Sequence, residues 1–135
     1  MSHAGPVLGG PVVVQVPAEP SMARLVRLAA SSLAAMASMD LDDIEDVKIV
    51  VSEVMAALIE HGDGAEITVK FEIAEHRLTI AGYTAAHSYV SSGDDIALSA
   101  TVLAAIASHH AIQHTDGQLL ITATYDAVAD PDDGT

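Results

Sequence analysis

Glu53 is the residue whose type and surroundings point most directly to chemistry. It lies in the run IEDVKIVVSEVMAALIEH, residues 44–61, with Ile49 and Ala57 one helical turn away on either side. A carboxylate in an apolar run must reach water in a cleft or find a partner, because burying it unpaired is costly. Two interpretations stay open: a catalytic carboxylate, or a solvated helix residue at the rim of a pocket.

Three histidines, His109, His110 and His114, lie close together in the sequence and raise the question of a metal site. Zinc sites need three or four converging ligands, often including cysteine, and the chain has no cysteine. We therefore expect no metal centre and no disulfide or thiolate chemistry. His87 lies in a predicted loop, and no role follows from its position alone.

The chain is strongly acidic, with a net charge of −14 from 19 acidic and 5 basic residues. Such a surface repels DNA and anionic membranes and attracts a basic partner. Aromatic residues make up 3% of the chain, which argues against a protein that stacks nucleic-acid bases on its rings. Arg24 and Arg27 are a basic pair on a predicted helix; they either form a solvated face or contact an acidic partner.

Length and apolar content predict one globular domain, since the chain has 135 residues and is 50% hydrophobic. No apolar run approaches the roughly 20 residues of a membrane span, and the first ten residues do not resemble a signal peptide. We expect a cytoplasmic protein with a flexible leader over 1–10, a folded domain over 11–125 and a disordered acidic tail over 126–135.

Hydrophobic periodicity predicts a long helix around Glu53. Apolar residues recur at steps of three and four and form one stripe, made of Ile44, Val47, Val51, Val54, Met55 and Leu58. Asp42 or Asp43 is expected to cap this helix, and Gly62 to end it. An earlier helix is expected to open at Pro20–Ser21 with Ser21 as its N-cap, and its apolar residues are Met22, Leu25, Val26, Leu28, Ala29, Leu33 and Met36. The apolar residues of a third predicted helix are Ile96, Leu98, Val102, Leu103 and Ile106, and the apolar stripes of all three helices are expected to lie in the core.

Short alternating runs predict the remaining elements. Strands are expected at 12–16, 67–73, 77–81, around Ile112 and at 119–125, with a loop at 83–93 and a third helix at 94–108. Glu75–His76 and Asp116–Gly117 are the expected tight turns. The resulting order predicts an α+β fold, a two-layer sandwich with a mostly antiparallel sheet and helices on one face.

Four stretches of the chain carry a family resemblance. They are VVVQVPAEPSMARLVRL, IEDVKIVVSEVMAALIEH, AEITVKFEIAEHRLTI and, more weakly, HAIQHTDGQLLITATY, which together span about residues 11–125. With them the chain resembles the anti-sigma-factor serine kinases of the RsbW and SpoIIAB type, which act in bacterial stress and sporulation control. Those proteins belong to the GHKL (HATPase) superfamily, with histidine kinases and gyrase B, and the resemblance implies that superfamily's two-layer fold.

The signature helix of that family carries a Glu followed one turn later by an Asn. The resemblance implies that the Glu helps to activate the attacking group and that the Asn oxygen holds Mg²⁺. Here the Glu position is Glu53, and the Asn position is Ala57, which has no oxygen to offer.

A second family motif, after the central hairpin, has an Asp that accepts a hydrogen bond from adenine and a Gly that makes room for the ring. The matching positions are Thr84 and Ala86, and alanine lacks the backbone freedom of glycine. A threonine on the last strand normally contacts the nucleotide, and the matching position here is Ala123.

A third family motif is a glycine-rich lid over the phosphates at the start of the last helix. In this chain Ala97 and Ser99 take the places of its glycines, and Asp94–Asp95 bring negative charge to that region. Phosphoryl transfer depends on positioning and on cancelling charge with metal and cations. Departures at several separate contacts therefore predict a degenerate nucleotide site.

Three functional hypotheses follow. The resemblance and these departures favour an anti-sigma-factor-like pseudokinase, which controls transcription by contact with a sigma factor or a STAS-type antagonist. The resemblance also implies a homodimer formed through the first strand and helix. The first alternative is an active serine kinase that phosphorylates a STAS antagonist, with Glu53 as base and Mg-ATP as cofactor. The second is a dimerisation module with an unrelated partner.

Overall fold

The chain folds into one five-stranded sheet and three helices. A computed structural model describes residues 10–88 and 94–127, without the side chains of 94 and 95. The element order is β1 (Val12–Val16), α1 (Met22–Met36), α2 (Leu41–His61), β2 (Ile67–Ala74), β3 (Arg77–Ala85), α3 (Asp94–Ile106), β4 (His109–Thr115) and β5 (Gln118–Asp126). Most of the predicted leader and tail lies outside the described residues, and Asp126, assigned to the tail, instead ends β5.

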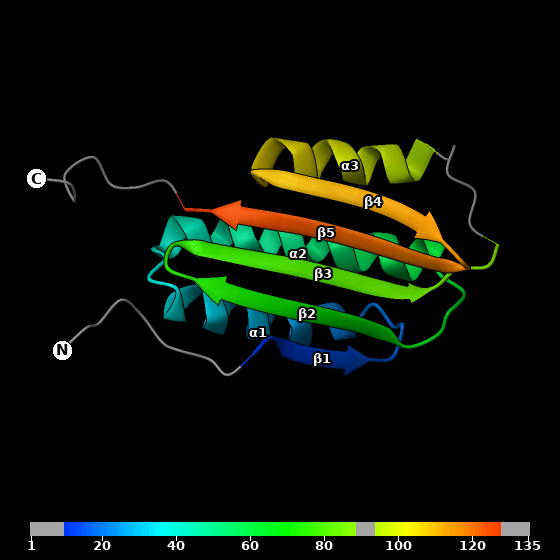
Figure 1. The fold of residues 1–135 in the computed structure, drawn as a ribbon, viewed down its shortest axis with the longest axis horizontal. Coiled ribbons are helices and arrows are strands. Elements are labelled where there is room, and N and C mark those ends of the chain that lie inside the picture. Colours follow the sequence, from blue (N-terminus) through cyan, green and yellow to red (C-terminus); the bar gives the residue numbers. More distant parts are fainter. Residues whose placement is uncertain (1–9, 89–93, 128–135) are drawn as a thin grey trace, which may run out of the picture.

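All neighbouring strands in the sheet are antiparallel, in the order β1-β2-β3-β5-β4. Figure 1 shows the sheet as one layer, with the helices on its far side and the near face uncovered. The predicted α+β two-layer architecture with helices on one face is therefore confirmed. Among the described helices, none has the length and hydropathy to cross a membrane.

The long helix α2 begins three residues earlier than predicted. Its N-cap is Asp40, whose carboxylate accepts a hydrogen bond from the Asp43 backbone N–H at 2.9 Å, while the Asp43 carboxylate accepts one from the Asp40 N–H at 3.1 Å. This reciprocal pair is a capping box, so the expectation that Asp42 or Asp43 is the cap residue was wrong. Ser21 is the N-cap residue of α1, as predicted, although its side chain makes no capping hydrogen bond.

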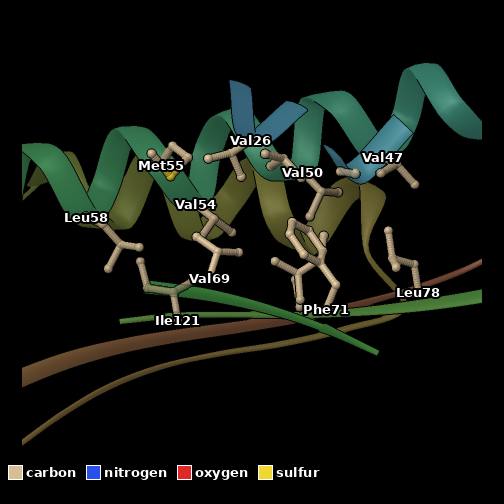
Figure 2. Packing of buried hydrophobic residues seen from close by; sticks show 14 of the residues in the cluster. Val26, Val47, Val50, Val54, Met55, Leu58, Val69, Phe71, Leu78 and Ile121 are labelled. Carbon is tan, nitrogen blue, oxygen red and sulfur yellow. The ribbon is translucent and has the colours of Figure 1, made fainter. Parts of the chain in front are cut away.

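The core lies between α2 and the sheet. In Figure 2 apolar side chains of α2 point down onto side chains of the strands, with Phe71 and Ile121 among the contacts beneath. Gly82 on β3 allows this close approach, because a Cβ there would lie 2.7 Å from Leu58 Cδ1 and 3.0 Å from Val54 Cγ1. Burial of these apolar side chains stabilises the fold by about 1.5–3 kcal/mol for each fully buried residue.

Not every apolar residue of the helices joins the core. On α1, Leu25 and Leu28 remain 50% and 60% exposed, and Met36 is 40% exposed; on α3, Leu98 is 66% exposed. The expectation that the stripes are wholly core was therefore wrong for these residues. They lie on helix faces turned away from the sheet, where periodicity alone cannot tell a core position from a surface one.

Strand β3 is longer than expected. It extends to Ala85, and its last residues pair with Leu120, Leu119 and Gln118 of β5, so the predicted loop at 83–93 begins only after them. This extension places Thr84 and Ala85 on a regular strand beside the C-terminal end of α2. The rest of that predicted loop lies partly outside the described residues.

Candidate functional site

Helix α2 presents Glu53 and Ala57 on the same face, one turn apart. Glu53 is half-buried, and among the described residues it makes no hydrogen bond or ion pair. Ala57 is 1% exposed, while its neighbour Ala56 is exposed. Helix α3 packs against α2, and its inward residues Ile96, Ser99 and Leu103 are buried. Ala57 has no side-chain oxygen for a metal ion, and its methyl group is shielded from solvent.

Thr84, which the family resemblance matches to an adenine-binding Asp, makes contacts within the fold. Its hydroxyl donates to the backbone carbonyls of Glu66 at 3.0 Å and Ala65 at 3.3 Å, and the side chain is 3% exposed. Its methyl group packs against Gly62, where a Cβ would lie 2.6 Å from Thr84 Cγ2 and 2.6 Å from the Leu58 carbonyl oxygen. Gly62 has extended backbone angles, so glycine is needed there for space, not for a left-handed cap.

The segment after β3 is held by its neighbours. Ala86 is fully buried; its N–H donates to the Gly117 carbonyl at 2.7 Å, and its carbonyl lies 2.6 Å from His114 Nε2. The Asp63 Oδ2 atom accepts from the His87 backbone N–H at 2.9 Å and lies 2.8 Å from His87 Nδ1. These bonds from His87 lower the pKa of the Asp63 carboxyl group.

The two positions matched to the glycine-rich lid do not form a loop. Both lie inside α3, where Ala97 is exposed and Ser99 is 8% exposed, so they face opposite ways. Ala123 on β5 pairs with Ile80, four residues along β3 from Thr84, so the structure does not bring Ala123 beside Thr84. The charges expected from Asp94 and Asp95 belong to side chains outside the described part of the chain.

Of the six positions expected for a nucleotide site, four are therefore buried by the protein itself. These are Ala57, Thr84, Ala86 and Ser99. Glu53 is half-buried at the margin, and Ala97 faces away. The donor set does not fit Mg²⁺, which binds through several oxygen ligands, because Glu53 is the only carboxylate among the six. Within the described residues, no group of three His, Cys, Asp or Glu side chains is placed to hold a metal ion.

One open hollow, of about 200 Å³, lies at Gly10, Pro11, Glu72 and Ile73, and three others lie where α1 meets α2. One, of about 300 Å³, is lined by Arg24, Arg27, Leu28, Ser31 and Lys48, and we call it the basic groove. Two adjoining hollows, of about 390 and 400 Å³, share Pro20 and Arg27 with each other. Three of the five basic residues of the chain thus gather where α1 meets α2.

The basic groove combines charge with apolar surface. Arg27 Nη1 donates to Ser52 Oγ at 3.3 Å, which fixes this guanidinium to α2, and Lys48 pairs with Glu45 at 2.7 Å. Arg24 makes no hydrogen bond or ion pair with any described residue, and the exposed Leu25 and Leu28 lie beside it on α1. The sequence singled out the arginines but missed Lys48 and the leucines; the i, i+3 spacing of Leu25 and Leu28, repeated by Arg24 and Arg27, was the available signal.

Three helices on one face of an antiparallel sheet, with a long central helix carrying a half-buried glutamate, define a class of ATPase-like domain. A family model described as the histidine kinase-like ATPase domain matches residues 16–91, more than half of the chain. The chain belongs to that family. The match runs from the last residue of β1 past the end of β3, and so includes Glu53, Ala57, Thr84 and Ala86.

Solved structures share this fold. The RsbU and RsbW domains of Rv1364c from Mycobacterium tuberculosis align over 90% of this chain with a TM-score of 0.63 and 21% identity. This chain covers 34% of that longer one. The histidine kinase AdeS from Acinetobacter baumannii aligns over 87% of this chain and 68% of its own, with a TM-score of 0.51 and 8% identity. Among curated proteins, no match was found.

Proposed function

We propose that this chain is an anti-sigma-factor-like regulatory protein that holds its partner by contact and transfers no phosphate. The observation that carries the proposal is the burial of Ala57, Thr84, Ala86 and Ser99 at the positions expected to surround a nucleotide. The likeness in fold to a structure containing an RsbW domain supports the regulatory class. Glu53 is then a remnant of the catalytic motif at the rim of a filled site.

The proposed partner is a sigma factor or a STAS-type antagonist, as the family resemblance implies. A sigma factor has basic DNA-binding faces, and a net charge of −14 attracts such faces over a distance. The basic groove then supplies the local contact: Arg24 is unpaired within the described structure, and exposed leucines lie beside it. An acidic, partly apolar segment of the partner fits this combination of charges and leucines.

Nucleotide binding is tested by the melting temperature with and without Mg-ATP. A ligand at one hundred times its dissociation constant stabilises a protein by about 2.7 kcal/mol. We expect no shift at millimolar Mg-ATP. A shift of several degrees would show that the nucleotide still binds, and transfer of label from γ-phosphate to a STAS protein would show that the chain is the active kinase instead.

Partner binding is tested with matched charge removals. In a pull-down against the host's sigma factors and STAS proteins, we expect the double variant Arg24→Gln/Arg27→Gln to bind at least about tenfold more weakly, since about 1.4 kcal/mol is a factor of ten. Lys70→Gln removes a similar charge on the opposite face of the sheet and should change binding less than about twofold. Binding to none of these proteins would favour the unrelated dimerisation module.

A further inference from the structure

The part of the chain over residues 96–125 is almost free of charge. Of the 19 acidic and 5 basic residues of the protein, only Asp116 lies within it. This stretch contains most of α3, all of β4 and most of β5. One end of the sheet and the helix beside it are therefore nearly neutral, although the chain as a whole has a net charge of −14. The proposed function makes no use of this region.

Strand β4 is an open edge of the sheet. It is the last strand in the order β1-β2-β3-β5-β4, so none of the described strands pairs with its outer side (Figure 1). Proteins commonly protect such an edge with a very short strand, a proline or a charged side chain, because unpaired backbone groups there bind other strands. β4 has seven residues, and none of them is proline, aspartate, glutamate, lysine or arginine. It lacks these protections.

The opposite edge strand, β1, is protected. It has only five residues and lies between Pro11 and Pro17, which have no backbone N–H to donate to a neighbouring strand. Of the two edges of this sheet, β4 is therefore the one that can accept a further strand.

The turn between β4 and β5 shows which backbone groups of β4 point outward. Asp116 and Gly117 have φ angles of 55° and 74°, as in a two-residue type I′ turn. The two residues that flank such a turn form a hydrogen-bonded pair, and every second residue of β4 then bonds to β5 in the same way. The N–H and C=O groups of His110 and Ile112 therefore point away from β5. No hydrogen bond from another described residue reaches them.

Helix α3 supplies uncharged surface beside this edge. It packs against β4, and from Ile96 to Ile106 it carries no charged residue, so whichever side faces an added strand is uncharged. Leu98 on this helix is 66% exposed. The helix does not cover β4 itself, because His110 and Gln113 remain exposed. A strand added to β4 therefore gains backbone hydrogen bonds from β4 and apolar contact with α3.

We propose that β4 is a docking edge for an extended segment of a partner protein, which joins the sheet as a sixth strand. Recognition of this kind takes its affinity from backbone hydrogen bonds and its specificity from alternate side chains. The segment has apolar residues at alternate positions, which contact α3 and the half-buried Ile112. It has no acidic residues, because a chain with a net charge of −14 repels them.

This docking edge is distinct from the basic groove. Helix α1, which carries Arg24 and Arg27, contacts β2 and β3, whereas β4 contacts α3 at the other edge of the sheet (Figure 1). The proposal goes beyond the proposed function and does not rest on it, so either one can fail alone.

A synthetic peptide with the required pattern tests the edge. The probe is acetyl-KTVTVTVTK-amide, and the control peptide has glutamate in place of each threonine. In an NMR titration of the full chain we expect saturable binding of the probe, with hydrogen exchange at the His110 and Ile112 amides at least about tenfold slower in the complex. The control peptide should bind at least about tenfold more weakly.

Three results of this titration would overturn the proposal. They are no binding of the probe, equal binding of the glutamate peptide, and binding that protects amides of α1 in place of those of β4. A second copy of the chain as the occupant would show itself without the probe, as slower exchange at His110 and Ile112 when the protein concentration rises from micromolar to millimolar. That result would also overturn the partner segment.

A proline in each edge strand supplies the matched comparison. His110→Pro removes an outward N–H and keeps the bonds to β5, since edge strands tolerate proline where the nitrogen faces outward. We expect it to bind the probe at least about tenfold more weakly. Val13→Pro makes the same change in β1, at a residue that is 51% exposed, and should alter binding less than about twofold.

If either proline variant does not fold, His110→Lys and Val13→Lys take their place, because a lysine on an edge strand also opposes strand addition. Melting curves of the variants show whether each is folded. Equal binding of the probe by the β4 and β1 variants would exclude β4 as the docking edge.

Discussion

Replacing Ala57 with asparagine restores the family residue at a position where the structure leaves no room for it. The Ala57 side chain is 1% exposed, and it lies on α2, which packs against α3. Asparagine adds three heavy atoms, and overpacking of this size costs typically about 1–3 kcal/mol. A buried amide without partners costs about another 1–3 kcal/mol.

Ala56→Asn is the matched control, because Ala56 is exposed on the same helix. It shares the loss of helix propensity, which is at most about 0.7 kcal/mol, but not the overpacking. We expect Ala57→Asn to destabilise the protein by about 2–6 kcal/mol and Ala56→Asn by less than about 1 kcal/mol. At about 4 °C per kcal/mol for a domain of this size, the first variant should melt about 8–24 °C lower.

The assay is urea and thermal unfolding of both variants, each with and without millimolar Mg-ATP. Equal stability of the two variants would show that the space beside Ala57 is open, contrary to the packing described here. A rise in melting temperature of Ala57→Asn with Mg-ATP would show that the nucleotide site lacks only one ligand. Either result would refute the argument that the protein fills its own site.

Three further substitutions test contacts that hold the fold together. Tyr125→Phe removes a buried hydroxyl that lies 3.0 and 2.9 Å from two carboxylates of α2, and should cost about 1–3 kcal/mol in urea unfolding. Burial and these hydrogen bonds raise the pKa of Tyr125 above its ordinary value near 10. The contribution of the hydroxyl to the free energy of unfolding is therefore present below pH 10 and is lost as the pH rises above it. The stabilities of wild type and variant should converge at strongly alkaline pH. Because the pKa of Asp63 is lowered, its carboxylate stabilises the folded state above the ordinary pKa near 4, and this stabilisation is lost as the pH falls below that value. The difference in melting temperature between wild type and Asp63→Asn should therefore shrink below about pH 4. A difference that stays constant with pH would exclude the bond to His87 as the cause of the stabilisation. Gly62→Ala should destabilise by about 1–3 kcal/mol through its clash with Thr84, and Gly64→Ala offers a comparison, since it meets no atom within 4 Å but has a φ of +83°.

The order of elements could be predicted because each one carries its own periodicity. Alternation marked β2 and β5, and the three- and four-residue repeat marked α2, whose residues Val47, Val51 and Met55 are all buried. The turns were recognisable too, because the pairs Glu75–His76 and Asp116–Gly117 each separate two strand patterns. In the structure His76 and Asp116 both adopt positive φ angles. These signals are local, and no tertiary contact overrides them.

The errors have a common physical cause. Leu25, Leu28 and Leu98 fit a helical stripe but face away from the sheet, and only the packing of the whole layer decides this. Likewise, the capping role of Asp40 depends on its reciprocal bond with Asp43, among several neighbouring aspartates that were equally plausible caps. The end of β3 was missed because Tyr83 to Ala85 pair with β5, a contact distant in sequence.

The expected site followed from resemblance alone, and the structure changes what its positions mean. Thr84 bonds inward to the Glu66 carbonyl, and Ala86 bonds to Gly117, so both positions now stabilise the junction of α2, β3 and the β4–β5 turn. A residue that satisfies buried backbone groups cannot be released to bind a ligand without leaving those groups unpaired. This is a stronger objection to nucleotide binding than the loss of any single motif residue. The buried residues of α2 and the sheet do not depend on a ligand, so the fold can persist without a nucleotide, and the open hollows beside Arg24 and Arg27 remain accessible as the proposed binding surface.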